Sequence, residues 1–446
     1  MQFLPDSNPG ACGSPEHLSR RSLLRGLGGA GLLGATSLGG ASWLTPLSEA
    51  LAVSAEKSSQ RPKSVIVLWL QGGASQLDTF DPHPGTEISF GTKAIDTNVR
   101  GIQFAEGLEQ SAELMSDFSV VRSVVSKEGD HARGIYNMKT GFRPFPGVIH
   151  PSIGAVVCHE IPPATAGGQT LDIPTHISIL PSNFAGRGGY LGAEFDAFQV
   201  GDPVNPVPDL RSRVDDQRNE RRFNALSVLE KSFARGRLAD LEGSRTLHQT
   251  AIGNARKMMT SEQLDAFNVS ERPKAEREAF GENRFGRGCL AAMALVEAGV
   301  RCVEVTLNGW DTHVDNHEGQ MKQKAILDPA LASLIRGLKE RDLYDDTIVM
   351  VGGEFGRTPK INLTEGRDHW PHGFSVVLGG GGLRSGLAIG ETDPGGEKQD
   401  PADPVRVEDV HATVLQQLGI DYEYELLTPI GRPLPISEGR PIRALL

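Results

Sequence analysis

Two stretches of the sequence hold the residues best suited to chemistry. One is GEFGRTPKINLTEGRDHWPHG, residues 353–373, whose candidate groups are Glu354, Arg357, Asp368, His369 and His372. The other is WDTHVDNH, residues 310–317, whose candidate groups are Asp311, His313 and His317. Carboxylate oxygens and imidazole nitrogens are the side-chain ligands that bind hard or borderline divalent cations without thiolates. Together the two stretches predict a divalent metal site.

The spacing within each stretch supports this prediction. Asp311 and His313 are two residues apart, so in an extended segment both point to one side of the chain. His369 and His372, or His313 and His317, share a face if their segments are helical. Each pattern alone is a weak signal, but the two patterns together favour a shared metal site.

A purely structural interpretation competes with the metal site. Asp and His at strand ends often cap helices or bond loop amides. Arg357 and Arg367 can pair with Glu354 and Asp368 as a network that orders the loop. This interpretation explains any single residue, and it explains the clusters together less well.

The elements that must position these residues are strands alternating with helices. Apolar, β-branched runs predict strands over 63–73, 118–125, 300–307, 346–353 and 374–382. Helical spacing of apolar residues predicts helices over 132–139, 326–343 and 405–420. The fold class is therefore α/β, a mostly parallel sheet flanked by helices on both faces. In such sheets function gathers at the carboxyl ends of the strands.

That rule adds three candidate residues to the two stretches. Asp78 follows the first predicted strand, and His131 and Arg133 follow the second. We therefore expect these side chains to lie at the same edge of the sheet as Asp311 and Glu354.

The remaining segments and the composition limit the class of protein. Charged residues alternating with apolar ones predict a helical insertion over about 205–285, and the Gly- and Pro-rich stretch after Pro151 predicts irregular structure. The hydrophobic content of 38% is typical of a globular protein. A formal net charge of -11 argues against nucleic acid as a partner. Cys158, Cys289 and Cys302 are too few for a disulfide framework.

The N-terminus predicts export. Arg20 and Arg21 precede a weakly apolar, Gly-rich run, and Ala50-Leu51-Ala52 has the small residues of a signal-peptidase site. We interpret residues 1–52 as a twin-arginine signal peptide and residues 53–446 as a single domain, periplasmic or secreted, with no stable membrane anchor after cleavage.

A family resemblance becomes specific at these motifs. The twin-arginine signal, GGASQLDTFDPHPG, HARGIYNMKTG, WDTHVDNHEGQM, EFGRTP, GRDHWP and the late GRP, in that order, resemble an exported bacterial family called domain of unknown function 1501. That family is grouped with the sulfatase and alkaline phosphatase superfamily. The resemblance implies a parallel-sheet α/β fold with one or two divalent metals (Zn, Ca, Mn or Mg) that hydrolyses sulfate or phosphate esters.

The resemblance also implies roles for individual residues. Asp78 is the nearest match to the aspartates that follow the first strand, and Asp311 with His313 or His317, Glu354 or Asp368 with His369, and His372 match the other metal ligands. Counting back from Thr140-Gly141 puts the nucleophile near His131, where the family pattern has Ser, Thr or a modified Cys. The chain also lacks the Cys-x-Pro-x-Arg signature of sulfatases.

Two functions follow as hypotheses. In the first, metal-assisted hydrolysis cleaves a small-molecule or polysaccharide ester. Arg133 or Arg357 neutralises the developing charge, and His131 serves as an unusual nucleophile or as a general acid. In the second, the fold is catalytically degenerate and serves as an exported binding or assembly protein, for a sulfated polysaccharide or a protein partner. Convergence of Asp311, His313, Asp368, His369 and His372 on one point favours the first hypothesis.

Overall fold

The sheet is built around a run of β-branched and aromatic residues, SVIVLWLQ, which forms strand β1 (Ser64–Gln71). The computed structural model describes residues 64–161, 171–182, 184–207, 210, 212–234 and 255–446, which belong to one compact unit. The predicted signal peptide and residues 235–254 of the predicted insertion lie outside the described residues. No helix within the described ranges is long and apolar enough to cross a membrane.

Within the described residues, the main sheet has nine strands in the order β12-β4-β11-β8-β1-β7-β5-β6, with β13 beside β4. The strands of the main sheet and of three smaller sheets, in chain order, are β1 (Ser64–Gln71), β2 (Ala94–Asp96), β3 (Gln103–Ala105), β4 (Phe118–Val125), β5 (His176–Ile179), β6 (Phe198–Val200), β7 (Cys302–Asn308), β8 (Thr347–Gly352), β9 (Gly356–Arg357), β10 (His369–Trp370), β11 (Phe374–Gly380), β12 (Ala388–Ile389), β13 (Val405–Arg406), β14 (Glu425–Leu427) and β15 (Pro433–Pro435). The pairs β2-β3, β9-β10 and β14-β15 form separate two-stranded sheets.

The sheet is mostly parallel, as the sequence predicts. β1 lies between β7 and β8 and pairs in parallel with both, with Val67 opposite Glu304 and Met350. β11 is the exception, because it runs antiparallel to both β4 and β8. β4 therefore runs in the same direction as β8, and the carboxyl ends of β1, β4, β7 and β8 meet at one edge.

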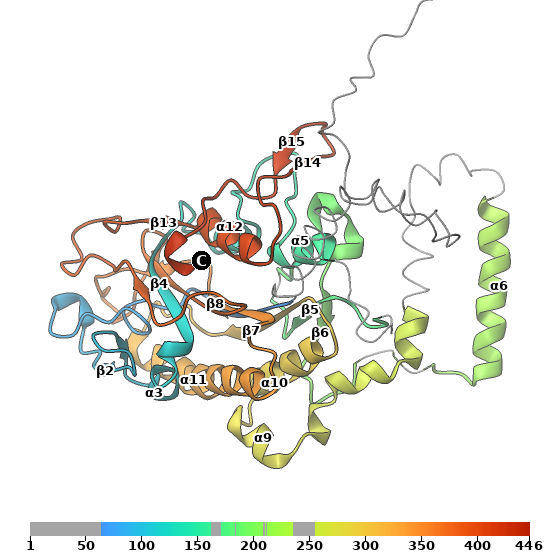
Figure 1. Ribbon diagram of the computed structural model, residues 1–446, viewed down its shortest axis with the longest axis horizontal. Coiled ribbons are helices and arrows are strands. Elements are labelled where there is room, and N and C mark those ends of the chain that lie inside the picture. Colours follow the sequence, from blue (N-terminus) through green and yellow to red (C-terminus); the bar gives the residue numbers. More distant parts are fainter. Residues whose placement is uncertain (1–63, 162–170, 183, 208–209, 211, 235–254) are drawn as a thin grey trace, which may run out of the picture. The chain divides into compact units, whose positions relative to one another are not determined.

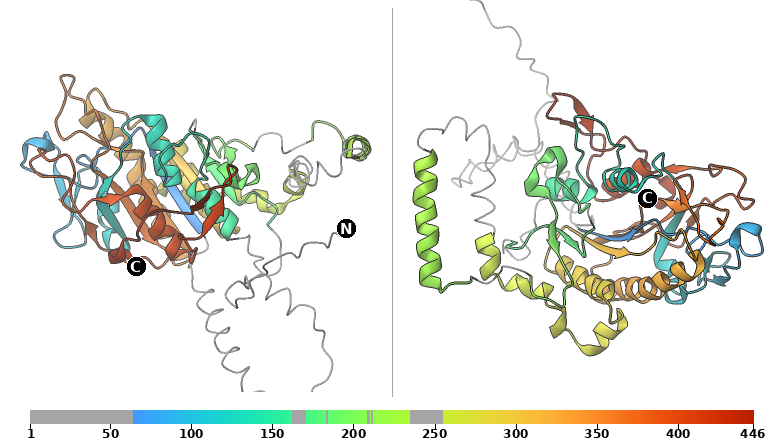
Figure 2. Two further views of the ribbon diagram at one scale, coloured as in Figure 1. Left: turned by 90° about the horizontal axis from the view of Figure 1, so that it is seen from above. Right: turned by 180° about the vertical axis from the view of Figure 1, so that it is seen from behind.

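Helices cover both faces of this sheet (Figure 1). The α-helices of the described residues are α3 (Glu109–Ala112), α4 (His131–Thr140), α5 (Ile153–Glu160), α6 (Asp216–Ala234), α9 (Lys274–Ala279), α10 (Arg284–Glu297), α11 (Asn316–Glu340) and α12 (Val407–Gln417). α10 and α11 lie on one face, and α5 and α12 lie on the other, as both the front view and the view from behind show (Figures 1 and 2).

The alternation of side chains along β1 explains the two faces. Ile66, Leu68 and Leu70 belong to a buried cluster that contains the apolar residues of α10 and α11. Val65, Val67 and Trp69 belong to a second buried cluster with the apolar residues of α4, α5 and α12. Successive side chains of a strand point to opposite faces, so a strand that is apolar at every position needs cover on both.

Three predicted elements differ from the structure. The stretch after Pro151, predicted to be irregular, contains α5, whose first six residues are buried and therefore show no amphipathic period. α11 begins at Asn316, ten residues before the predicted start, because the polar run NHEGQMKQKA hides its helical pattern. Within the predicted insertion, residues Glu262–Phe267 form a 3-10 helix rather than an α-helix.

Candidate metal centre

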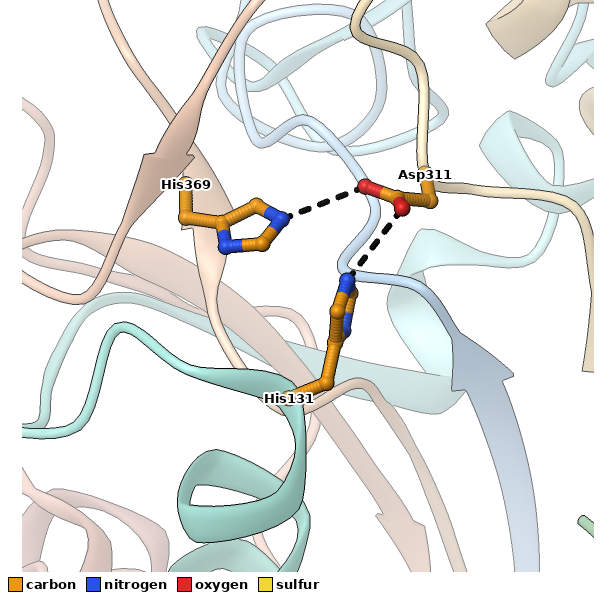
Figure 3. A group of neighbouring side chains, drawn as sticks. All are labelled: His131, Asp311 and His369. Carbon is orange, nitrogen blue, oxygen red and sulfur yellow. Dashed lines mark hydrogen bonds and ion pairs between the residues drawn. The ribbon is translucent and has the colours of Figure 1, made fainter. Parts of the chain in front are cut away.

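The carboxyl ends of three parallel strands bring the predicted chemistry together. Asp311 lies in the loop after β7, Glu354 lies two residues after the end of β8, and His131 opens α4 after β4. His369 lies on β10, which pairs with β9 so that His369 is opposite Arg357. Figure 3 shows His131 and His369 approaching Asp311 from different segments.

Local sequence fixes the first residue of α4. The Asp130 side chain caps the helix by accepting a hydrogen bond from Arg133 N (3.3 Å), and Gly141 ends it in the left-handed conformation at φ 76°. These are the residue types that favour the two ends of a helix. His131 is therefore held at the helix start and faces the loops that follow β7 and β8.

Asp311 is the centre of the cluster. Its Oδ2 lies 3.2 Å from His131 Nε2, and its Oδ1 lies 3.1 Å from His313 Nε2 and 3.2 Å from His369 Nε2. One ligand atom from each of Asp311, His131 and His369 lies within 4.8 Å of the others. The Asp311 side chain is 44% exposed, so the cluster opens to solvent.

The loop that carries Asp311 needs a glycine beside it. Gly72, directly after β1, has a φ of 113°, and a Cβ on Gly72 would lie 2.5 Å from Asp311 N. Only glycine permits both this conformation and this close approach. The sequence indicates that Gly72 ends a strand, but it does not indicate that Gly72 allows Asp311 to approach.

Two imidazoles face one another across the cluster. His313 Nδ1 lies 2.8 Å from Asp368 Oδ1, and His369 Nδ1 lies 2.9 Å from Gly129 O. Both partners are acceptors, so each Nδ1 carries its proton and donates it. Burial lowers the pKa of His369, which leaves this ring neutral with its lone pair on Nε2.

The two Nε2 atoms are 3.0 Å apart. Facing lone pairs at this distance repel unless a proton or a cation lies between them. The three atoms His313 Nε2, His369 Nε2 and Asp311 Oδ1 form a triangle with edges of 3.0, 3.1 and 3.2 Å. Ligands bonded at about 2.1 Å to one cation lie about 3.0 Å apart in an octahedron and about 3.4 Å apart in a tetrahedron. The triangle therefore fits one face of a metal coordination shell.

His131 has a different environment. Its Nδ1 lies 2.8 Å from Glu354 Oε1, and its Nε2 faces Asp311. The hydrogen bond to Glu354 is the largest influence and raises the pKa of His131, with Asp311 adding to it against the opposing effect of burial. The raised pKa favours the imidazolium form, which donates from both nitrogens.

Glu354 orients His131 through a hydrogen bond from the buried side of the site. It is fully buried, and its Oε1 also accepts hydrogen bonds from Gly72 N (2.9 Å) and Gln71 Nε2 (3.2 Å). Its Oε2 has no hydrogen-bond partner among the described residues. A buried carboxylate oxygen without a partner is costly, so it points to a further hydrogen bond or a cation in the functional state.

Arg357 positions Asp311, and its side chain is not accessible to a substrate. The Arg357 side chain is fully buried, and its Nη2 donates to Asp311 Oδ1 at 2.5 Å and also to Gly72 O. Its Nε and Nη1 donate to Gly73 O and Arg367 O, each at 3.0 Å. Burial alone would raise the pKa of Asp311, but the hydrogen bond and charge of Arg357 lower it to about 2.

Three predicted site residues lie outside this cluster. Asp78 is buried, and its carboxylate accepts from Ser75 Oγ, Thr92 Oγ1, Asn316 Nδ2 and Arg367 Nε at 2.5, 2.6, 2.8 and 3.0 Å. His372 Nδ1 instead contacts Asp400 Oδ1 at 2.9 Å. Arg133 turns away to Glu128, with Nε 2.5 Å from Oε2. The residues that converge are His131, Asp311, His313, Glu354, Arg357, Asp368 and His369.

Asp368 offers a direct test of the cluster, because it orients His313 without touching Asp311. Replacing Asp368 with asparagine removes the charge that fixes the His313 tautomer, while the side chain keeps its shape. Loss of such an orienting partner typically lowers metal affinity by about 10–100-fold. Titration calorimetry with Zn²⁺ measures the change, and Asp117→Asn, in a carboxylate that contacts Lys339 instead, is the matched control. Equal affinities for the two variants would contradict the assigned role.

The comparisons with known proteins agree with the motifs in the sequence. A family model described as Protein of unknown function (DUF1501) matches residues 62–446. The match confirms the resemblance to this family that the motifs indicate. No curated protein matches the chain significantly.

Distant similarities to solved structures also occur. Ps i-CgsB in complex with k-i-k-neocarrahexaose has 10% identity and a TM-score of 0.39, over 81% of this chain and 72% of that chain. PsFucS1 sulfatase from Pseudoalteromonas sp. has 13% identity and a TM-score of 0.37, over 85% and 73%. Alkaline phosphatase from the Antarctic bacterium TAB5 has 12% identity and a TM-score of 0.34, over 81% and 99%. Similarities this distant assign neither an activity nor a residue role to this chain.

Proposed function

Because this chain belongs to the family described as Protein of unknown function (DUF1501), whose name assigns no activity, we propose its function from the geometry around Asp311. The proposed function is a metal-dependent hydrolase of sulfate or phosphate esters, exported by the twin-arginine route. The observation that carries the proposal is the triangle of His313 Nε2, His369 Nε2 and Asp311 Oδ1, whose edges are 3.0–3.2 Å.

The donor set fits a transition-metal ion better than Ca²⁺ or Mg²⁺. His313, His369 and Asp311 would hold the ion, with His131 on the other oxygen of Asp311. Two imidazoles with one carboxylate suit Zn²⁺ or Mn²⁺, whereas Ca²⁺ and Mg²⁺ prefer oxygen ligands throughout. Asp368 and Gly129 O supply the outer hydrogen bonds that metal-binding histidines usually have.

A bound divalent ion supplies charge stabilisation for an ester anion and favours ionisation of a water molecule. The chain supplies the rest. Glu354 accepts the hydrogen bond from His131 Nδ1, and His131 Nε2 lies 3.2 Å from Oδ2 of Asp311, whose side chain is 44% exposed. From there His131 can donate a proton to the leaving oxygen of an ester. Arg357 keeps Asp311 ionised and fixed, which keeps the site organised before substrate arrives.

Turnover of two model esters tests the proposal. We expect the purified full-length chain, loaded with Zn²⁺ or Mn²⁺, to hydrolyse p-nitrophenyl phosphate or p-nitrophenyl sulfate, and to lose this activity in EDTA. Because His131 would donate the proton, His131→Gln is expected to lower kcat by about 10²–10⁴-fold for an ester with a more basic leaving group, such as phenyl phosphate, and by less for the p-nitrophenyl esters. His159→Gln is the matched control, since His159 contacts Glu160 away from the cluster.

The second function is a binding or assembly protein with a degenerate site. The residues that open α4, His131, Ala132 and Arg133, include no serine, threonine or cysteine, which favours this alternative. It predicts stoichiometric metal without hydrolysis of either ester. Metal binding together with an absence of turnover would therefore replace the hydrolase proposal with this one.

A further inference from the structure

A cleft of about 520 Å³ lies beside the metal centre and has no role in the function proposed so far. Its walls come from the end of β4, from the segment after α4, from the start of α12 and from the C-terminal hairpin β14-β15. Ser126 and Lys127 line it, and the same segment continues through Gly129 to His131.

Two backbone connections keep the cleft close to the metal centre. Ser126 N donates to Pro371 O at 2.7 Å, and Gly129 O accepts from His369 Nδ1 at 2.9 Å. The segment 126–131 therefore borders the segment 369–372 along its length, with the cleft at one end and His131 at the other. The segment 126–131 thus connects the wall of the cleft directly to the cluster around Asp311.

The cleft carries cationic side chains that are not neutralised. Four cationic residues line it against three carboxylates, while the whole chain has a formal net charge of -11. Two of the carboxylates form ion pairs, Asp400 with His372 and Glu408 with Arg406, and the third, Glu438, is exposed and interacts electrostatically with Arg406. Lys127 and Arg432 are exposed and have no acidic partner within the described part of the chain. Unpaired cations in a concave site attract anions.

Aromatic and aliphatic side chains also line the cleft. Phe142 stacks on His150 with ring centroids 4.3 Å apart and an interplanar angle of 8°. Burial lowers the pKa of His150 to about 4, so this ring is neutral near pH 7. Phe145 and Ile430, each 55% exposed, line the cleft as well. Exposed apolar side chains within a polar cleft are typical of ligand sites.

We propose that this cleft binds the carbohydrate part of an anionic sugar ester, with Lys127 and Arg432 contacting sulfate or phosphate groups and Phe145 packing against a sugar ring. The proposal deepens the hydrolase function and rests on it for the position of the reacting ester. Guanidinium and ammonium groups bind sulfate and phosphate oxygens, and an aromatic face packs on the apolar C–H surface of a sugar. The combination favours a charged sugar over a simple inorganic anion.

Binding can be measured without turnover. We expect the full-length chain to bind a low-mass dextran sulfate in titration calorimetry, more tightly than uncharged dextran of the same mass, and less tightly as salt rises. The titration is run in EDTA, so failure of the metal centre does not affect it. Lys127→Gln/Arg432→Gln is expected to weaken binding about three- to tenfold, because each exposed ion pair contributes modestly. Phe145→Ala is expected to weaken it as well.

The matched control is Lys257→Gln/Lys274→Gln, which removes the same charge from exposed lysines outside the cleft. It should leave dextran sulfate binding within about twofold, because a general effect of net charge on a salt-screened surface is small. Equal weakening by both double variants would overturn the proposal, and so would absence of binding. Polyglutamate that binds as tightly as dextran sulfate would overturn the assignment to a sugar. Binding in EDTA together with no ester turnover would support the cleft while contradicting the hydrolase.

Discussion

Replacing Asp311 with asparagine is expected to abolish divalent metal binding, with affinity for Zn²⁺ reduced by more than about 100-fold. Asp311 is the one carboxylate in the cluster that contacts His131, His313 and His369. The asparagine keeps the size of the side chain but loses the charge that attracts the ion. It also gives Arg357 Nη2 a neutral partner in place of a carboxylate. Titration calorimetry on the full-length chain measures the affinity.

Two controls make this result specific. Asp117→Asn changes a carboxylate that contacts Lys339 and should leave the affinity unchanged. His372→Gln tests a residue that the sequence predicts as a ligand and the structure places against Asp400, so it should also leave the affinity unchanged. A metal affinity that survives in Asp311→Asn, or is lost in His372→Gln, would show that the ion binds elsewhere.

Replacing Asp78 with asparagine is expected to lower the free energy of unfolding by about 3–5 kcal/mol, the usual cost of leaving one partner of a buried ion pair alone. Asp78 and Arg367 are 2% and 0% exposed, and Asp78 Oδ2 lies 3.0 Å from Arg367 Nε. Arg367 also donates to Thr358 O, Pro359 O and Ile88 O, so its guanidinium holds three loop carbonyls together. Urea unfolding of the metal-free chain measures the loss.

The same substitution should also weaken metal binding, by about 10–100-fold. Arg367 immediately precedes Asp368 and His369, and its backbone N donates to Thr312 O at 3.0 Å, between Asp311 and His313. The Asp78–Arg367 pair therefore holds the two loops of the metal centre side by side. Glu304→Gln, which breaks the buried ion pair with Lys139, is the matched control. It should destabilise the fold to a similar degree and leave metal affinity within about threefold. Equal losses of affinity in both variants would leave Asp78 with no specific positioning role.

Acid unfolding gives an independent check on Asp78. Burial raises the pKa of this carboxyl, but Arg367 and three hydrogen bonds lower it more, so the net shift is downward. Its contribution to stability is therefore present above the ordinary Asp value of about 4 and is lost as pH falls through the lower pKa of the folded state. Asp78→Asn should remove that part of the acid dependence, and an unchanged pH profile would contradict the ion pair's role.

The sequence predicts the sheet well because the strands are apolar at nearly every position. β1, β4, β7, β8 and β11 all carry short apolar runs, which suit strands of a sheet buried on both faces. The antiparallel direction of β11 was not predictable, because strand periodicity is the same in either direction. α5 was hidden for a related reason, since a helix buried on most sides has no amphipathic pattern.

The site was predictable in its residue types and less so in its contacts. Asp311 and His313 follow β7, and His369 lies on β10, in the segment beyond β8; these segments meet because β7 and β8 flank β1 in parallel and end at one edge, which the predicted α/β fold implies. Asp78 and His372 lie outside the cluster because of the directions in which their side chains point, and the spacing of residues in the sequence does not determine those directions. His372 lies only three residues from His369, but β10 is extended rather than helical, so the two histidines do not share a face. Of the two alternatives for neutralising charge, Arg133 and Arg357, the structure places Arg133 against Glu128, a contact that the spacing does not indicate.

The central claim is that His313, His369 and Asp311 hold a divalent cation. The most direct measurement is the metal content of the purified full-length chain after dialysis against Zn²⁺, combined with X-ray absorption spectroscopy of the bound ion. We expect one ion per chain, bound to at least two imidazole nitrogens, and we expect this ion to be lost in Asp311→Asn. A chain that holds no Zn²⁺, and whose melting temperature is unchanged by Zn²⁺ or Mn²⁺, would contradict it.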